Sequence, residues 1–169
     1  MRREELIREF DVEKRIDELA SLIADADVIA RSKQQVSEFI ADHCNNDCNC
    51  VRLAEDFLDA LERLQNHLRT LMEVNRNAMA NLLISCIASW FTGYSDIVED
   101  TEERLEYFID ELIGEALADF EENIPLFGVR PSSAVERDFY DLAKGVVERL
   151  EEELHGEDIV NEVFSHIRL

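Results

Sequence analysis

Apolar residues recur along most of the chain at intervals of three and four, the spacing that places side chains on one face of an α-helix. The first such series runs from Val12 to Ala30, and Asp11 stands where it can cap the first turn. A second helix is expected to begin at Ser32, because Gln35 follows it at the spacing of a capping box. The chain is therefore predicted to open with two amphipathic helices.

The longest series runs from about Val51 to Phe91 and contains a heptad seam. A seam of this length predicts a long helix that packs lengthwise against a partner helix. That partner is either the helix that begins at Val12 or, in a homodimer, a second copy of the seam. Because Asn75 is polar, the alternative is a break there and two shorter helices. The seam residues are Phe57, Leu61, Leu64, Leu68, Leu71, Asn75, Ala78 and Leu82.

Beyond Asn75 this series is apolar on almost every side, which is typical of a central helix. A stripe of small polar side chains interrupts it at intervals of four residues. The stripe consists of Asn77, Asn81, Ser85 and Ser89. We favour close packing of another helix against these small side chains, and the alternative is one wall of a ligand cleft.

Helical spacing continues to the last residues, with few turn-forming residues in between. Gly93 is expected to end one helix and Thr101 to cap the next, and Ser133 with Glu136 forms another capping box. The chain has only five Gly and two Pro, which argues against a sheet with many turns. We therefore predict an all-α, single-domain bundle of six or seven helices over residues 1–169, with one long central hydrophobic helix.

The charge is large and unevenly placed. The chain carries 39 acidic and 17 basic residues, a formal net charge of −22, and residues 95–169 alone carry 22 acidic and 6 basic side chains. Such a field repels nucleic acids and anionic membranes and favours a basic protein partner, although high solubility is the simpler interpretation of acidity. The N-terminal sequence has no signal-peptide pattern, so a cytoplasmic protein with reduced thiols is expected.

No catalytic motif stands out, so the leading hypothesis is a non-enzymatic interaction module. It would bind a basic protein as an inhibitor, immunity-type factor, assembly chaperone or nucleic-acid mimic, without binding nucleic acid or membrane itself. We expect the recognition charges on two acidic segments of the C-terminal half. The candidate residues are Glu99, Glu102, Glu103, Glu106, Asp110, Glu151, Glu152 and Glu153.

A second hypothesis is a small metal-binding or redox-sensing protein. His43, Cys44, Cys48 and Cys50 lie close together in a segment rich in Asn and Asp, which favour turns. Thiolate and imidazole are good ligands for zinc, and thiolates also hold iron–sulfur clusters. The Cys-x3-Cys-x-Cys spacing differs from the paired Cys-x2-Cys of common zinc sites, so a polar turn with incidental cysteines is the favoured interpretation.

A third hypothesis is a Mg²⁺-dependent nucleotide hydrolase. Glu103 with Glu106 and Glu148 with Glu151 each place two carboxylates one helical turn apart. This spacing resembles that of the all-α nucleoside triphosphate pyrophosphohydrolases, and the resemblance implies magnesium held between facing helices. The same spacing also occurs on solvated faces of acidic helices.

Overall fold

A computed structural model describes residues 2–44, 47–124 and 130–167. The predicted all-α fold is confirmed, since these residues form helices and no strand occurs among them. The elements are α1 (Arg3–Glu9), α2 (Val12–Ala24), α3 (Asp27–Phe39), the π-helical turn η1 (Ile40–Cys44), α4 (Cys48–Val74), α5 (Arg76–Trp90), α6 (Ser95–Glu122), α7 (Ala134–Glu153) and α8 (Gly156–Ser165). None of the described helices has the length and hydropathy needed to span a membrane.

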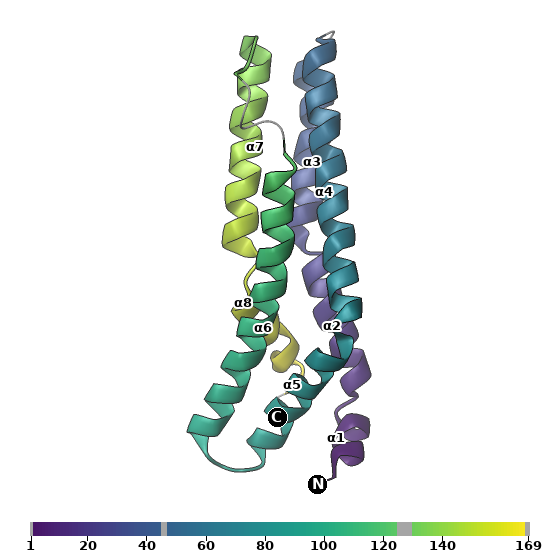
Figure 1. Cartoon of the computed structure of the whole chain (residues 1–169), viewed down its shortest axis with the longest axis vertical. Coiled ribbons are helices and arrows are strands. Elements are labelled where there is room, and N and C mark those ends of the chain that lie inside the picture. Colours follow the sequence, from purple (N-terminus) through teal and green to yellow (C-terminus); the bar gives the residue numbers. More distant parts are fainter. Residues whose placement is uncertain (1, 45–46, 125–129, 168–169) are drawn as a thin grey trace.

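The helices stack end to end into four columns with an up-down-up-down course (Figure 1). The columns are α2 followed by α3, α4 followed by α5, α6 alone, and α7 followed by α8. Each column packs on its neighbours: α2 and α3 contact α4, α4 and α5 contact α6, α6 contacts α8, and α7 and α8 return to α3 and α2. The short helix α1 packs against α2 and α5. Buried apolar side chains from all columns form one continuous core.

The first half of the heptad seam is buried within the chain. Phe57, Leu61, Leu64 and Leu68 are each at most 2% exposed, because α2, α3 and α6 cover this face of α4. The helix that begins at Val12 is thus one of the partners of the seam, as predicted. A homodimer through residues 57–82 stays a prediction, and these four side chains are not exposed to a second copy.

The predicted long hydrophobic helix is two helices, because α4 ends at Val74 and α5 begins at Arg76. Asn75 Nδ2 donates a 2.8 Å hydrogen bond to the Leu71 carbonyl oxygen and so competes with the backbone ladder at the break. Of the two alternatives, one long helix or two shorter ones, the second is therefore correct. The helix that packs most widely is the amphipathic α4, which contacts α2, α3, η1, α5, α6 and α7.

The polar stripe of α5 does not serve as a packing surface along its whole length. Asn77, Asn81 and Ser85 are exposed, and Arg3 from α1 donates a 2.6 Å hydrogen bond to Asn81 Oδ1. Ser89 alone is buried, where its hydroxyl lies 3.0 Å from the Thr101 hydroxyl of α6. Close packing through a small residue is thus observed only at the last position of the stripe.

The first predicted helix is divided at Asp25 and Ala26, where the local sequence has no strong break signal. Gln65 of α4 donates a 3.0 Å hydrogen bond to the Ala24 carbonyl oxygen, and Arg69 of α4 pairs with Asp25 at 2.7 Å. The carbonyl freed at the end of α2 is therefore satisfied from a neighbouring helix. A side chain outside the helix supports this break, so periodicity within the helix could not reveal it.

Two hydroxyl groups predicted to cap helices instead lie inside them. Ser32 in α3 is buried and donates a 2.6 Å hydrogen bond to the Val28 carbonyl oxygen. Thr101 in α6 donates to the carbonyl oxygen of Ile97 at 3.1 Å. Within a helix, Ser and Thr satisfy their hydroxyl groups on the preceding turn in this way, so the residue type alone did not distinguish a cap from an interior position.

Candidate interaction surface

A pocket with a volume of about 680 Å³ opens at the end of the bundle where α5 passes into α6. Large apolar side chains make up most of its wall, and two carboxylates, Glu99 and Glu102, complete it. The volume lies within the range of roughly 300–1,000 Å³ that is usual for ligand pockets. The apolar lining residues are Phe10, Trp90, Phe91, Val98 and Ile167.

Three separate parts of the chain build this pocket. Trp90 and Phe91 stand at the end of α5, where Gly93 adopts a φ of +75° that allows the chain to turn into α6. Phe10 comes from the junction of α1 and α2, and its ring packs edge-to-face on Phe91 with centroids 6.0 Å apart. Ile167 follows α8. The fold therefore assembles an aromatic lining that no single segment contains.

A hydrogen bond joins the aromatic wall to the acidic wall. Trp90 Nε1 donates to Glu102 Oε1 at 3.1 Å, while the Trp90 ring packs edge-to-face on Phe164 with centroids 5.2 Å apart. A half-buried indole usually finds a partner for its N–H in this way. The bond orients the indole and keeps one carboxylate against the apolar lining.

Exposed apolar side chains surround the same turn. Among the described residues, five large apolar side chains are strongly exposed, and Phe91, Tyr94 and Ile97 of the α5–α6 turn are three of them at 58%, 67% and 45%. Exposed apolar groups that gather in one place commonly mark a surface for a partner. We call these three residues, together with the pocket and the acidic residues of the first half of α6, the α5–α6 surface.

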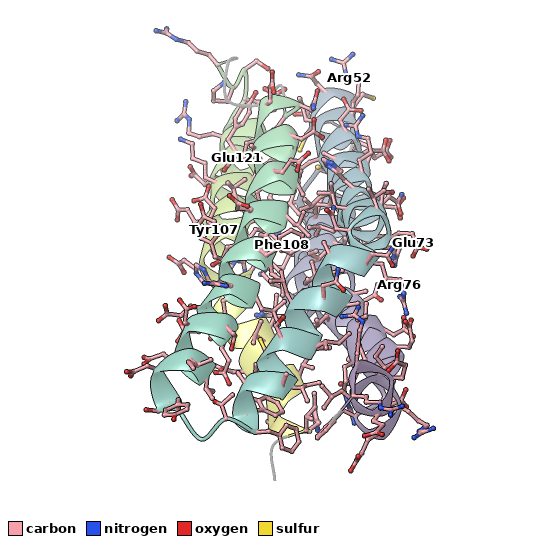
Figure 2. The ribbon with its side chains drawn as sticks, turned by 60° about the horizontal axis from the view of Figure 1, so that its bottom comes forward. Arg52, Glu73, Arg76, Tyr107, Phe108 and Glu121 are labelled. Atoms are coloured by element: carbon pink, nitrogen blue, oxygen red, sulfur yellow. The ribbon has the colours of Figure 1, made fainter. Side chains whose placement is uncertain are left out.

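The five predicted recognition residues of α6 stand along one stretch of this helix. Figure 2 shows oxygen-tipped side chains along the outer edge of α6. Glu99 and Glu102 line the pocket, and Glu103 is exposed beside them. Glu106 is half-buried, and burial followed by the charge of Glu157 raises its pKa. The first half of α6 thus keeps several carboxylates close enough to raise the pKa of one of them.

Asp110 has a structural role in the same helix. Its Oδ1 accepts a 2.6 Å hydrogen bond from the backbone N–H of Gly156, the first residue of α8. A carboxylate at this place satisfies a donor that the start of α8 leaves unpaired, and it also meets the positive end of the helix dipole. Asp110 therefore joins α6 to α8.

The three predicted recognition residues of α7 are placed differently. Glu153 forms an ion pair with Arg31 of α3 at 2.9 Å, and Glu151 hydrogen-bonds to Glu121 of α6. Glu152 is exposed between them. The acidic end of α7 therefore makes contacts within the bundle, and it does not line the pocket.

Glu121 and Glu151 form a carboxyl pair between α6 and α7, and Glu121 is labelled in Figure 2. The hydrogen bond to Glu151, followed by partial burial, raises the pKa of Glu121 to about 7. Two carboxyl groups can share a hydrogen bond only when one of them keeps its proton. This contact is therefore complete in mildly acidic solution and weakens at alkaline pH.

We expect this pair to make the fold less stable as pH rises. The pKa of Glu121 is higher in the folded chain than the 4.5 of a solvated glutamate, so the pair stabilises most below pH 4.5. Its contribution is lost as pH rises through 7. Because Glu121 is exposed and solvent screens the pair, the loss should be only about 1 kcal/mol. Urea unfolding of the wild-type chain and of Glu121→Gln, at about pH 5 and about pH 8, measures it.

The matched control is Glu122→Gln, which removes one neighbouring exposed carboxylate. Both variants reduce the net charge equally, so general repulsion among carboxylates affects them alike. Only Glu121→Gln should flatten the fall in stability between the two pH values. The same slope in both variants would contradict the proton-sharing contact.

The cysteine segment is arranged around two buried thiols. Cys44 and Cys50 lie in contact and are at most 1% exposed, whereas Cys48 is exposed. His43 packs on the ring of Phe39 with centroids 5.2 Å apart. Burial, followed by the contact with Cys44, raises the pKa of Cys50 to about 12. A buried thiol that keeps its proton is a poor nucleophile and a poor metal ligand.

The described residues contain no group of three or more His, Cys, Asp or Glu side chains placed to hold a metal ion. The four candidate ligands in residues 43–50 are therefore not gathered into such a group. A metal-binding or redox role for this segment stays a prediction.

The two Glu-x-x-Glu pairs do not face each other. Glu151 contacts Glu121, which lies fifteen residues beyond Glu106 on the same continuous helix α6. Fifteen residues of α-helix span roughly 22 Å. Glu106 instead lies near Glu157 at the start of α8. A magnesium site held between the two pairs therefore has no counterpart in this arrangement.

Comparisons of this chain with protein-family models, with curated proteins and with solved structures found no match. Charge counting predicted Glu99 and Glu102 as recognition residues, and both carboxylates line the pocket. The aromatic lining was missed, although Trp90 and Phe91 beside Gly93, just before the acidic segment, were a usable signal.

Proposed function

We propose that the chain is a non-enzymatic interaction module that binds a basic protein through the α5–α6 surface. The observation that carries this proposal is the apolar pocket with Glu99 and Glu102 in its wall, among three exposed apolar side chains. Interfaces of this composition combine an apolar centre with a charged rim. We also propose that the protein works in the cytoplasm.

The distribution of charge supports a basic partner. Residues 95–169 carry most of the net negative charge, and the described residues that line the pocket include no Lys or Arg. Such a field attracts a positively charged surface before contact and repels nucleic acid and anionic lipid. Because the attraction acts through water, binding should weaken as salt is added.

The experiment compares two triple variants with equal changes in charge. The test variant is Asp96→Lys, Glu99→Lys and Glu103→Lys, all at exposed positions in the first half of α6. The control is Glu55→Lys, Asp59→Lys and Glu73→Lys on the exposed side of α4. Proteins captured by the wild-type chain from cells that make it are identified, and the strongest basic candidate is purified.

Affinity for that purified partner is then measured at low and physiological salt for all three chains. We expect the test variant to bind at least about tenfold more weakly, because three attractive contacts become repulsive. The control should keep most of the affinity. Equal losses of affinity in the two variants would show general attraction to an acidic protein. Unchanged affinity in both variants would show that the α5–α6 surface does not bind the partner.

A further inference from the structure

We propose that the pocket receives one large apolar side chain of the partner, presented beside a Lys or Arg that pairs with Glu99. This inference rests on the proposed function and specifies the partner segment. It identifies the occupant as a basic segment with a single apolar anchor.

The lining argues for an apolar anchor. Phe10, Trp90, Phe91 and Val98 present carbon surface to the cavity, and Phe91 is 58% exposed. Covering such surface removes it from water, with a gain of about 25 cal/mol for each Å². At about 680 Å³ the cavity has room for an aromatic side chain and part of a neighbouring one.

The charges argue for a cation beside the anchor. A neutral apolar group alone would take the Glu99 carboxylate partly out of water and offer it no compensating charge, which is costly. A Lys or Arg compensates this carboxylate, is attracted by the neighbouring carboxylates of α6, and also favours the face of an aromatic ring such as Trp90. An acidic segment would be repelled by the same groups. Charge complementarity therefore selects a basic segment.

Trp90 provides a direct readout, because it is the only tryptophan of the chain and its indole lines the pocket. The probe is a short synthetic peptide of Lys, Ala and Leu with one central Phe and no Trp. Titration should shift the fluorescence of Trp90 in a saturable way. The same peptide with Ser in place of Phe should bind at least tenfold more weakly, while retaining the salt-sensitive attraction of its lysines.

Two matched pairs of variants locate the binding. Val98→Lys places a positive charge in the pocket, whereas Val74→Lys makes the same change at the exposed end of α4, outside the α5–α6 surface. Glu99→Gln removes a lining carboxylate, and Glu55→Gln removes an exposed carboxylate of α4, outside the α5–α6 surface. We expect at least tenfold weaker peptide binding for the first member of each pair and less than threefold for the second. Circular dichroism checks that each variant folds.

The outcomes distinguish binding in the pocket from general attraction to an acidic protein. If both peptides bind equally and Trp90 fluorescence stays constant, the anchor is wrong, while the proposed function still holds for charge-driven binding. If neither peptide binds in low salt, both the apolar anchor and the proposed function are wrong. If the Val98→Lys change abolishes concentration-dependent dimerisation in sedimentation and leaves peptide binding intact, the pocket serves a second copy of the chain and the inference is overturned.

Discussion

Replacement of Gly156 by alanine is expected to lower the free energy of unfolding by about 3 kcal/mol. Gly156 opens α8 against the middle of α6, and the backbones approach closely there. A Cβ at this position would overlap the carbonyl oxygen of Glu106 and lie 3.0 Å from Asp110 Oδ1. Because the overlapped atom belongs to the backbone, one helix must shift to relieve the overlap. The same shift strains the 2.6 Å hydrogen bond from the Gly156 N–H to Asp110.

The control for this prediction is Gly145→Ala in α7. A Cβ at Gly145 meets nothing within 4 Å, and the residue lies inside a helix, where alanine is favoured over glycine by roughly 0.5–1 kcal/mol. Urea unfolding followed by circular dichroism should therefore move the two variants in opposite directions. A Gly156→Ala variant as stable as Gly145→Ala would show that α8 does not approach α6 as described.

Loss of the Glu136 carboxylate is expected to cost about 2 kcal/mol, since it removes the buried acceptor shared by Ser132 and Asn49. Glu136 is only 2% exposed. Its Oε2 accepts hydrogen bonds from the Ser132 N–H at 2.6 Å and from the Ser132 hydroxyl, and its Oε1 accepts one from Asn49. The Ser133 hydroxyl accepts a 3.2 Å hydrogen bond from the Glu136 N–H, as predicted for a cap of α7. Glu136→Ala would therefore loosen the contact between the starts of α4 and α7.

The effect should depend on pH with a definite sign. The hydrogen bond from the Ser132 side chain, against the opposing effect of burial, lowers the pKa of Glu136. A lowered pKa means that the carboxylate stabilises the fold above about pH 4.5 and loses this contribution as pH falls through the folded value. Urea unfolding of Glu136→Ala should show the full loss at neutral pH and a smaller one in acid. Asp138→Ala, at an exposed position of the same helix, should change stability by less than about 0.5 kcal/mol.

Helix type followed from the sequence more readily than helix ends did. In the series that begins at Val12, the four side chains up to Ile23 are buried, because a helix buries every third or fourth residue, whereas Ala30 lies beyond the break and is exposed. Its break at Asp25 depends on Gln65 and Arg69 of another helix, and the start of α8 depends on Asp110. Such caps join residues that are far apart in the chain, so no local pattern contains them. Tertiary contacts decided these boundaries.

Some residues of the candidate site could likewise be predicted from the local sequence, and others could not. Charge counting was enough to select Glu99 and Glu102, because acidity accumulates locally along one helix. The pocket beside them also needs Phe10 and Ile167, which come from opposite ends of the chain. The packing of α1 on α5, of α5 on α6 and of α8 on α6 brings these residues together. The sequence around Phe10 does not indicate which cavity this side chain will line.

The most direct test of the account is an NMR titration of the labelled protein with the Lys-, Ala- and Leu-based peptide that carries one Phe. The indole N–H of Trp90 donates to Glu102 in the free protein, so it reports on both walls of the pocket through one signal. We predict a saturable shift of this signal, with further shifts confined to residues near Phe10, Val98 and Glu99. Shifts of similar size along all acidic helices, with the Trp90 signal unmoved, would contradict a binding site at the α5–α6 surface.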